Sequence, residues 1–323
     1  MMQVFHGKKI SSLVAVVPRN ETSFDDEWRN YGLTENKAKK YKEAMGFDRH
    51  RIAPPDVTSS DLCATGLRHL LEAGKLAKED IGALLFISQT PDYFLPPTAN
   101  VLQGRFGLGE DVFCLDINQG CAGFVVGLMQ ALLLLDLPAM KKVVLLTGDT
   151  ASKQVSPRNR ASYPLLGDGG SVAVVERDAS AGRICLDVRM DGSRHEALIV
   201  PAGAYRCMST PETLVEREDA SGILRSQQQI QMDGPGIFSF TMEDVLRQVR
   251  DTLAFSGDTV DTIDSFLFHQ PNRFVLNSMA DKLGVARNKM PSNITGIYGN
   301  CSSVSIPLNI VHNCREGLLR GSR

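Results

Sequence analysis

The chain has 323 residues, of which 43% are hydrophobic and 22% are charged. This composition is typical of a globular protein with about two domains' worth of hydrophobic core, and it excludes disordered and fibrous classes. The 35 basic and 37 acidic residues are intermixed and give a formal net charge of -2. No overall field therefore indicates nucleic acid or an anionic membrane as a partner.

Seven cysteines are scattered along the chain without a Cys-x-x-Cys pair or a Cys/His cluster, at positions 63, 114, 121, 185, 207, 301 and 314. An odd, scattered set argues against a disulfide framework and against zinc, so we expect a reducing cytoplasm and no metal. The longest apolar stretch, 124–135, is shorter than the roughly 20 residues that cross a bilayer. It predicts a buried helix and no membrane insertion.

An internal repeat organises the chain: two segments about 180 residues apart have the same order of elements. Each contains a helix, an apolar strand, a polar turn with proline, a second helix, and a small-residue turn that opens an apolar helix. In the first segment these elements are predicted at 62–74, 81–88, 89–91, 103–108 and 120–123. In the second they are predicted at 241–255, 263–268, 269–271, 280–285 and 299–302. The repeat predicts a layered α/β fold with pseudo-twofold symmetry.

Two more strands, at 142–146 and 171–176, complete the first segment and have no counterpart in the second before Arg323. We therefore predict an N-terminal half at 1–178 and a C-terminal half at 179–323. By the repeat, a further C-terminal piece of about 30 residues that would supply the last strands is expected to be missing after Arg323.

Cys121 lies after a predicted strand, in a tight glycine turn that opens an apolar helix. A thiol there faces unsatisfied backbone N–H groups and the positive end of the helix dipole, which lower its pKa. Most cysteines are small buried hydrophobic residues, and we keep that interpretation for the other six. The flanking glycines and the start of the helix indicate that Cys121 is an activated nucleophile.

His269 follows the predicted strand 263–268, and Asn300 lies in the second small-residue turn, at the place equivalent to Cys121. A neutral imidazole at a strand end can donate a hydrogen bond to a thioester oxygen or transfer a proton. Asparagine is also a common turn residue with a left-handed backbone. Its equivalence to Cys121 favours a functional role, and we expect the three polar groups within about 5 Å of a common point. The other five histidines are predicted to be structural.

Three segments around these residues carry a family resemblance: Cys-Ala-Gly-Phe at 121–124, Phe-His-Gln-Pro-Asn at 268–272, and Tyr-Gly-Asn-Cys-Ser-Ser-Val-Ser-Ile-Pro at 298–307. They resemble the nucleophile, histidine and asparagine motifs of the β-ketoacyl-ACP synthase III family, the initiating condensing enzymes of type II fatty acid synthesis. Further motifs of the family are similar to Thr-Pro-Asp at 90–92, Gly-Asp-Gly at 167–169 and Met-Asp-Gly at 232–234. The resemblance spans nearly the whole chain.

The resemblance implies a thiolase-like fold, with two pseudo-symmetric halves in a layered αβαβα arrangement, and a homodimer. It implies that Cys121 takes an acyl group from acyl-CoA or acyl-ACP. His269 and Asn300 would then stabilise the enolate formed as malonyl-ACP loses carbon dioxide, because two neutral donors aimed at one oxygen stabilise its developing charge. The reaction is a decarboxylative Claisen condensation in fatty acid, specialised acyl or polyketide biosynthesis, with thioester substrates and no cofactor.

Four other residues acquire roles only through the resemblance. Arg160 matches a family arginine that contacts the nucleotide end of CoA, Asn272 matches the asparagine of a His-Gln-Ala-Asn motif, and Trp28 is the single tryptophan available to stack on CoA. Arg273 matches, one place early, an arginine that docks the acyl carrier protein. Pro271 replaces the alanine of the family motif, and such departures point to a specialised acyl or carrier partner.

Two other functions stay open at this stage. An acyltransferase of the same superfamily would move the acyl group from Cys121 to an amine or hydroxyl. A non-catalytic partner subunit of a heterodimer typically lacks the nucleophile, which this chain has. The apolar loop Tyr-Phe-Leu-Pro-Pro at 93–97 is expected to be exposed and to be covered by the second subunit of a dimer.

Overall fold

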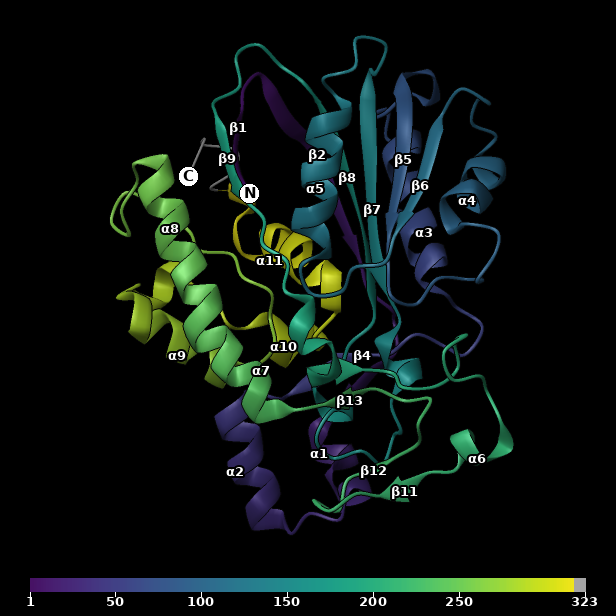
Figure 1. The fold of residues 1–323 in the computed structure, drawn as a ribbon, viewed down its shortest axis with the longest axis vertical. Coiled ribbons are helices and arrows are strands. Elements are labelled where there is room, and N and C mark those ends of the chain that lie inside the picture. Colours follow the sequence, from purple (N-terminus) through teal and green to yellow (C-terminus); the bar gives the residue numbers. More distant parts are fainter. Residues whose placement is uncertain (317–323) are drawn as a thin grey trace.

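The computed structural model describes residues 1–316. Residues 317–323 of the predicted C-terminal half, and the piece expected after Arg323, lie outside the described residues. A five-stranded mixed sheet with the order β2-β8-β7-β5-β6 forms the centre (Figure 1). Its strands are β2 (Lys8–Val16), β5 (Ile81–Ile87), β6 (Phe113–Ile117), β7 (Lys142–Asp149) and β8 (Gly169–Arg177). Strand β5 is parallel to β6 and β7, whereas β8 is antiparallel to β7 and β2.

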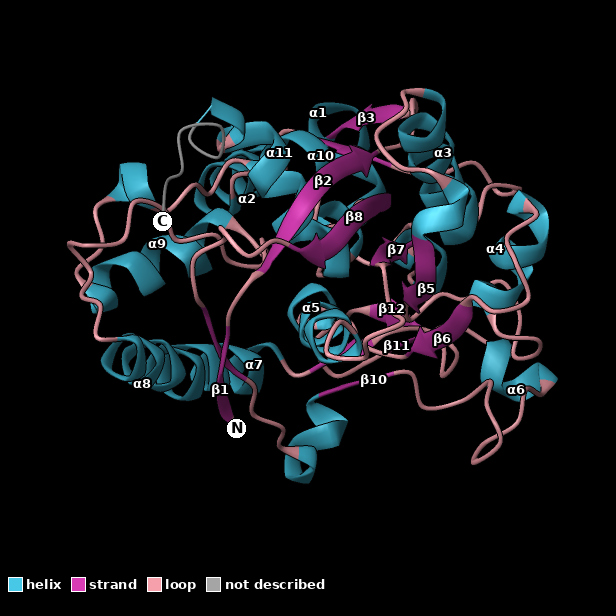
Figure 2. Cartoon of the chain, turned by 90° about the horizontal axis from the view of Figure 1, so that it is seen from above, coloured by secondary structure: helices cyan, strands magenta, loops and turns pink. Residues whose placement is uncertain are grey.

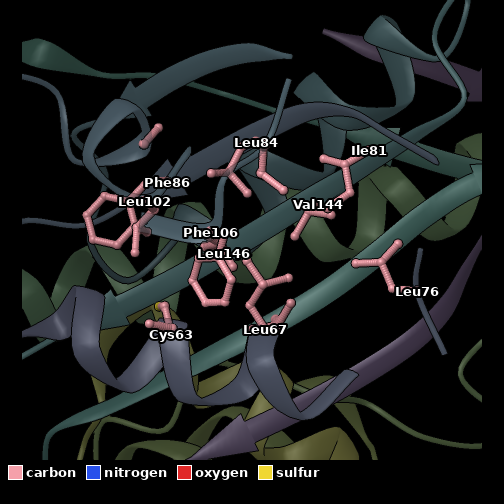
Figure 3. Packing of buried hydrophobic residues seen from close by; sticks show 14 of the residues in the cluster. Cys63, Leu67, Leu76, Ile81, Leu84, Phe86, Leu102, Phe106, Val144 and Leu146 are labelled. Carbon is pink, nitrogen blue, oxygen red and sulfur yellow. The ribbon is translucent and has the colours of Figure 1, made fainter. Parts of the chain in front are cut away.

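The central strands are covered on both faces, which explains why β5 and the middle of β7 are apolar. Because successive side chains point to opposite faces, Phe86 and Leu146 pack against α3 (Ser59–Glu72) and α4 (Thr98–Phe106) (Figure 3). Their neighbours on the other face pack against the apolar helix α5 (Gly123–Leu134). Figure 2 shows α5 on the side of the sheet opposite α3 and α4.

The remaining strands form short antiparallel pairs around this sheet. The pairs are β1 (Met2–Phe5) with β9 (Ile184–Asp187), β3 (Glu21–Ser23) with β4 (Arg49–Arg51), β10 (Leu198–Ile199) with β13 (Gln231–Met232), and β11 (Arg217–Glu218) with β12 (Leu224–Arg225). Three helices accompany these pairs on the periphery: α1 (Phe24–Glu27), α2 (Glu35–Met45) and α6 (Pro211–Leu214).

The C-terminal half is largely helical within the described residues. Helix α7 (Gly234–Phe240) continues through a π-helical turn, Thr241–Val245, into α8 (Leu246–Ser256). Three helices follow, α9 (Arg273–Leu283), α10 (Ile294–Tyr298) and α11 (Ser305–Asn313). The helices of the predicted repeat are present in the predicted order, but the strand at 263–268 is not, and the division of the chain between 178 and 179 stays a prediction.

The strand predicted at 263–268 is wrong for the part of the chain that the structure describes, where this segment is assigned no strand. A strand exists through a ladder of backbone hydrogen bonds with a neighbour. Here the backbone is joined to residue 289 through the hydrogen bond from Phe266 N to Lys289 O, at 2.7 Å. An apolar run alone therefore did not suffice, because no strand among residues 1–316 forms a ladder with it.

The described residues also bear on two other classes of function. In residues 1–316 no helix is both long enough and apolar enough to pass through a membrane. The same residues contain no group of three or more His, Cys, Asp or Glu side chains arranged to hold a metal ion.

Candidate active site

The turn that carries Cys121 joins β6 to α5 and packs directly against a turn of the C-terminal half. Cys121 is an exposed free cysteine, and α5 begins two residues later at Gly123, as the sequence predicts. A Cβ atom on Gly123 would lie 2.6 Å from Cγ2 of Ile87 and 3.0 Å from Cβ of Ser303. The absence of a side chain at Gly123 therefore allows the two halves to bring their matched turns into contact.

Asn300 is fixed by its backbone against the chain that precedes β8. Its N–H donates to the Leu165 carbonyl at 2.6 Å, and its own carbonyl accepts from Gly167 N at 3.1 Å. Gly299 has φ +84°, and a Cβ there would lie 2.5 Å from the Leu166 carbonyl oxygen. Only glycine combines this backbone conformation with so close an approach. These backbone contacts therefore fix the position of the Asn300 Cα atom, from which the amide side chain extends.

Ser302 orients the side chains of both His269 and Asn300 through its backbone. Its carbonyl lies 3.2 Å from Nδ1 of His269, and its N–H donates to Oδ1 of Asn300 at 3.0 Å. A carbonyl can only accept, so Nδ1 carries the proton and Nε2 is left for the reacting groups. The amide nitrogen of Asn300, a donor, points away from the Ser302 N–H.

The backbone conformation of Ser302 is unusual. With φ +49° it is the one non-glycine residue in the left-handed region among residues 1–316. This conformation costs an L-residue roughly 1–2 kcal/mol. Strain of this kind persists where surrounding contacts impose it, and it concentrates at functional sites. Here it coincides with the residue that contacts both predicted donors.

Cys121 and His269 interact directly and shift each other's pKa. Desolvation by the surrounding protein acts to raise the pKa of the Cys121 thiol, but the charge of His269 and a side-chain hydrogen bond to it outweigh that effect, so this pKa lies below its ordinary value. Burial acts to lower the pKa of His269, yet the contact with Cys121 and the bond to Ser302 raise it above its ordinary value. Both shifts act toward a thiolate beside an imidazolium, which is the reactive form of a cysteine nucleophile.

The structure thus joins the three residues that the sequence singled out. Cys121 contacts His269, and Ser302 links His269 to Asn300. Their placement about one common point, and their catalytic roles, stay predictions.

Sequence reasoning missed Asp149, a buried carboxylate at the end of β7. It is 1% exposed and accepts hydrogen bonds from the Gln89 N–H at 2.8 Å and the Ser303 hydroxyl at 2.9 Å. Burial raises its pKa, although these hydrogen bonds oppose that rise. The available signal was its place in Thr-Gly-Asp directly after an apolar strand, where polar groups of α/β folds gather.

Arg160 lies apart from these residues, beside a cavity of about 430 Å³. Its guanidinium donates to the carbonyls of Gly222, at 2.8 Å, and Ser221. The lining also includes Lys37, Lys40 and Tyr41 of α2. The cavity is therefore flanked by three basic side chains.

The structure gives Trp28, Asn272 and Arg273 other surroundings. Trp28 is half-buried, with the Arg29 guanidinium 4.5 Å from the centre of its ring. Asn272 caps α9, since its side chain accepts from Val275 N at 2.9 Å. Arg273 is exposed and packs over Gly46, where a Cβ would lie 2.7 Å from Nε of Arg273. Their substrate and carrier roles remain predictions.

Comparisons with known proteins agree with this architecture. Models of the 3-oxoacyl-[acyl-carrier-protein] synthase III family match residues 115–192, and models of its C-terminal domain match residues 253–323. A beta-ketoacyl-[acyl-carrier-protein] synthase III from Streptococcus suis is 32% identical over 97% of this chain and 88% of the relative. One from Streptococcus gordonii is 30% identical over 97% of this chain and 91% of the relative.

Among solved structures, a 3-oxoacyl-(acyl-carrier protein) synthase from Burkholderia xenovorans LB400 superposes with a TM-score of 0.90 at 33% identity. The alignment covers 98% of this chain and 88% of that protein. The fold and its matched turns define a thiolase-fold condensing enzyme. The chain belongs to the 3-oxoacyl-ACP synthase III family, also called β-ketoacyl-ACP synthase III.

Proposed function

We propose that this enzyme condenses an acyl thioester, acyl-CoA or acyl-ACP, with malonyl-ACP in a decarboxylative Claisen reaction of fatty acid or specialised acyl biosynthesis. The observation that carries the proposal is the direct pairing of Cys121 with His269, in a site where Ser302 also orients Asn300. The relatives named above are synthases of 3-oxoacyl-ACP, which is the product such a condensation forms.

In the first step, the Cys121 thiolate attacks the acyl carbonyl and expels the CoA or carrier thiolate, which takes a proton from solvent, so that His269 keeps the proton on Nε2. The lowered pKa of Cys121 increases the fraction of thiolate, the nucleophile of this step. The acyl group is then held on sulfur while the free thiol departs and malonyl-ACP enters.

In the second step, malonyl-ACP loses carbon dioxide, and the bonding electron pair passes to the thioester as an enolate. The imidazolium form of His269, which carries a proton on both ring nitrogens, donates from Nε2 to the enolate oxygen, where the charge develops, and the Asn300 amide donates to the same oxygen. The enolate carbon attacks the acyl carbonyl on Cys121, which releases the Cys121 thiolate and leaves 3-oxoacyl-ACP. No cofactor enters these steps.

The cavity beside Arg160 supports CoA as a donor. Lys37, Lys40 and Arg160 place positive charge around a partly apolar hollow, as a nucleotide with phosphates requires. Trp28 would lie against the same nucleotide. Asn272 would contribute to substrate binding indirectly, because its side chain caps α9 and so fixes the start of that helix. Arg273, exposed at that helix, would meet the acidic carrier protein.

The enzyme is proposed to act as a homodimer in the cytoplasm. Tyr93, Phe94 and Leu95 are exposed in the single chain, Phe94 by 75%. Strand β6 is at the edge of the central sheet, and its Phe113 is also exposed. Exposed apolar side chains and an open sheet edge are both features that a second subunit would cover. All seven cysteines are free thiols, as a reducing compartment requires.

The testing experiment supplies acyl-CoA and malonyl-ACP and measures carbon dioxide release together with the mass of the carrier product. Condensation predicts both carbon dioxide and 3-oxoacyl-ACP. Transfer of the acyl group to an added amine or alcohol without carbon dioxide release would favour the acyltransferase alternative, and inactivity with every acyl donor would favour a partner subunit. Sedimentation at micromolar concentration tests the dimer, which a monomeric mass would contradict.

A further inference from the structure

The turn that orients the two donors rests on a carboxylate that the proposed chemistry does not use. Asp149 Oδ2 accepts from Ser303 N at 3.4 Å and from Ser303 Oγ at 2.9 Å, and the side chain of Ser302 also contacts the carboxylate. Asp149 Oδ1 accepts from Gln89 N at 2.8 Å and from Ser88 Oγ at 3.3 Å. One carboxylate therefore ties the 302–303 turn of the C-terminal half to the 88–90 turn of the N-terminal half.

We infer that Asp149 is a positioning residue of this reaction, which holds the 302–303 turn in the conformation that aims His269 and Asn300. This inference rests on the proposed function. Asp149 touches neither donor; it acts through Ser302, whose carbonyl meets His269 Nδ1 and whose N–H meets Asn300 Oδ1. The left-handed backbone of Ser302 requires an external constraint, and the carboxylate supplies one.

The bonding pattern explains why a carboxylate is needed. Both oxygens of Asp149 face donors, one set from each half of the chain. An ionised carboxylate is an acceptor at both oxygens, whereas an asparagine of the same shape offers one acceptor and one NH₂ group. In the Asp149→Asn variant, the NH₂ group would replace one of the two acceptor oxygens and would face an N–H or O–H donor. The turn on that side, 302–303 or 88–90, would then lose its hydrogen bonds to residue 149.

An electrostatic effect of the Asp149 charge on the Cys121 thiol does not explain why a carboxylate lies at this position. That charge acts to raise the pKa of the Cys121 thiol, which opposes formation of the nucleophile. A carboxylate kept for its electrostatic effect on the thiol would therefore be unfavourable. Positioning and electrostatic roles consequently predict shifts of opposite sign when the charge is removed, and this difference makes the inference testable.

The experiment measures the rate of Cys121 alkylation by iodoacetamide against pH, by mass of the Cys121 peptide, in the full chain. Neighbouring thiols compete little, because burial raises the pKa of Cys63 and Cys301. The variants are Asp149→Asn, Ser303→Ala and His269→Ala. The control is Asp187→Asn, which removes a buried aspartate that pairs instead with Arg189 and the N-terminus.

If Asp149 positions the donors, Asp149→Asn moves the alkylation inflection to higher pH, toward that of His269→Ala. It also lowers malonyl-ACP decarboxylation about tenfold or more while the KM for acyl-CoA stays nearly constant. Ser303→Ala, which removes the 2.9 Å bond, shifts the inflection in the same direction by less. Asp187→Asn leaves the inflection in place.

An inflection that moves to lower pH in Asp149→Asn would show an electrostatic role, and one that stays in place would show a merely structural role; either overturns the inference. If Asp149→Asn does not fold, Ser303→Ala decides, and an unchanged inflection there overturns the inference as well. Failure of the proposed function is distinguishable, because the wild type itself would then release no carbon dioxide from malonyl-ACP, whatever the alkylation inflections of the variants.

Discussion

Replacement of Asn300 by alanine tests the division of labour in the site. Acyl transfer to Cys121 does not require the amide, whereas decarboxylation of malonyl-ACP places charge on an oxygen that the amide is proposed to bind. The Oδ1 atom of Asn300 is occupied by the Ser302 N–H at 3.0 Å, so the amide nitrogen is the donor. Asn300→Ala should therefore retain acyl loading and lose most decarboxylation.

The expected loss of decarboxylation rate follows from the removal of one of the two proposed donors to the enolate oxygen. Loss of one preorganised donor to a developing oxyanion costs on the order of 3 kcal/mol, about 10²-fold in rate. The variant also leaves the Ser302 N–H without this acceptor, which should lower the free energy of unfolding by about 1 kcal/mol. Because His269 donates to the same oxygen and is oriented by the same serine, the double variant with His269→Ala should lose less than the sum of the two.

The assay pairs acyl loading, measured by intact mass, with carbon dioxide release from labelled malonyl-ACP. Asn313→Ala is a matched control, since Asn313 is exposed and bonds to Asn293 and Asn309. It should change stability by no more than about 0.5 kcal/mol and leave decarboxylation unchanged. Decarboxylation at the wild-type rate in Asn300→Ala would refute the role given to the amide.

Three further variants test other parts of the account. His269→Ala should move Cys121 alkylation to higher pH, because His269 lowers the thiol pKa, and an unchanged pH profile would contradict the pairing. Gly123→Ala should lower the free energy of unfolding by about 1–3 kcal/mol in denaturant titrations, since its Cβ would lie 2.6 Å from Ile87. An unchanged free energy of unfolding would show that the Cys121 turn and the Ser303 turn can move apart. Arg160→Ala should weaken acyl-CoA binding about tenfold, measured as KM for loading, but leave acyl-ACP unaffected; equal losses would remove Arg160 from the CoA site.

The fold was predictable where local pattern and packing agree. The apolar runs at 81–88 and 142–146 became β5 and β7, and the apolar stretch from Phe124 became the buried helix α5. The run at 263–268 has the same character and is not a strand in the described residues, because strand formation depends on partners far away in the chain.

The sequence was sufficient to single out Cys121, His269 and Asn300, which the structure links, and their catalytic roles stay predictions. Glycine turns marked Cys121 and Asn300 in the sequence. The supporting contacts were not predictable, since Asp149 and Ser302 act through hydrogen bonds to residues more than 30 positions distant, such as Gln89 and His269. No local pattern encodes such a pair. Likewise, the helix-capping contact of Asn272 with Val275 became evident only in the structure.

The central claim is that Cys121 carries the acyl group, and peptide mapping after incubation with acyl-CoA tests it most directly. The account predicts that wild type, His269→Ala and Asn300→Ala each gain the mass of a single acyl group on the peptide that contains Cys121, and that Cys121→Ala gains none. An acyl group on the Cys121→Ala protein, or on another cysteine of the wild type, would contradict the account.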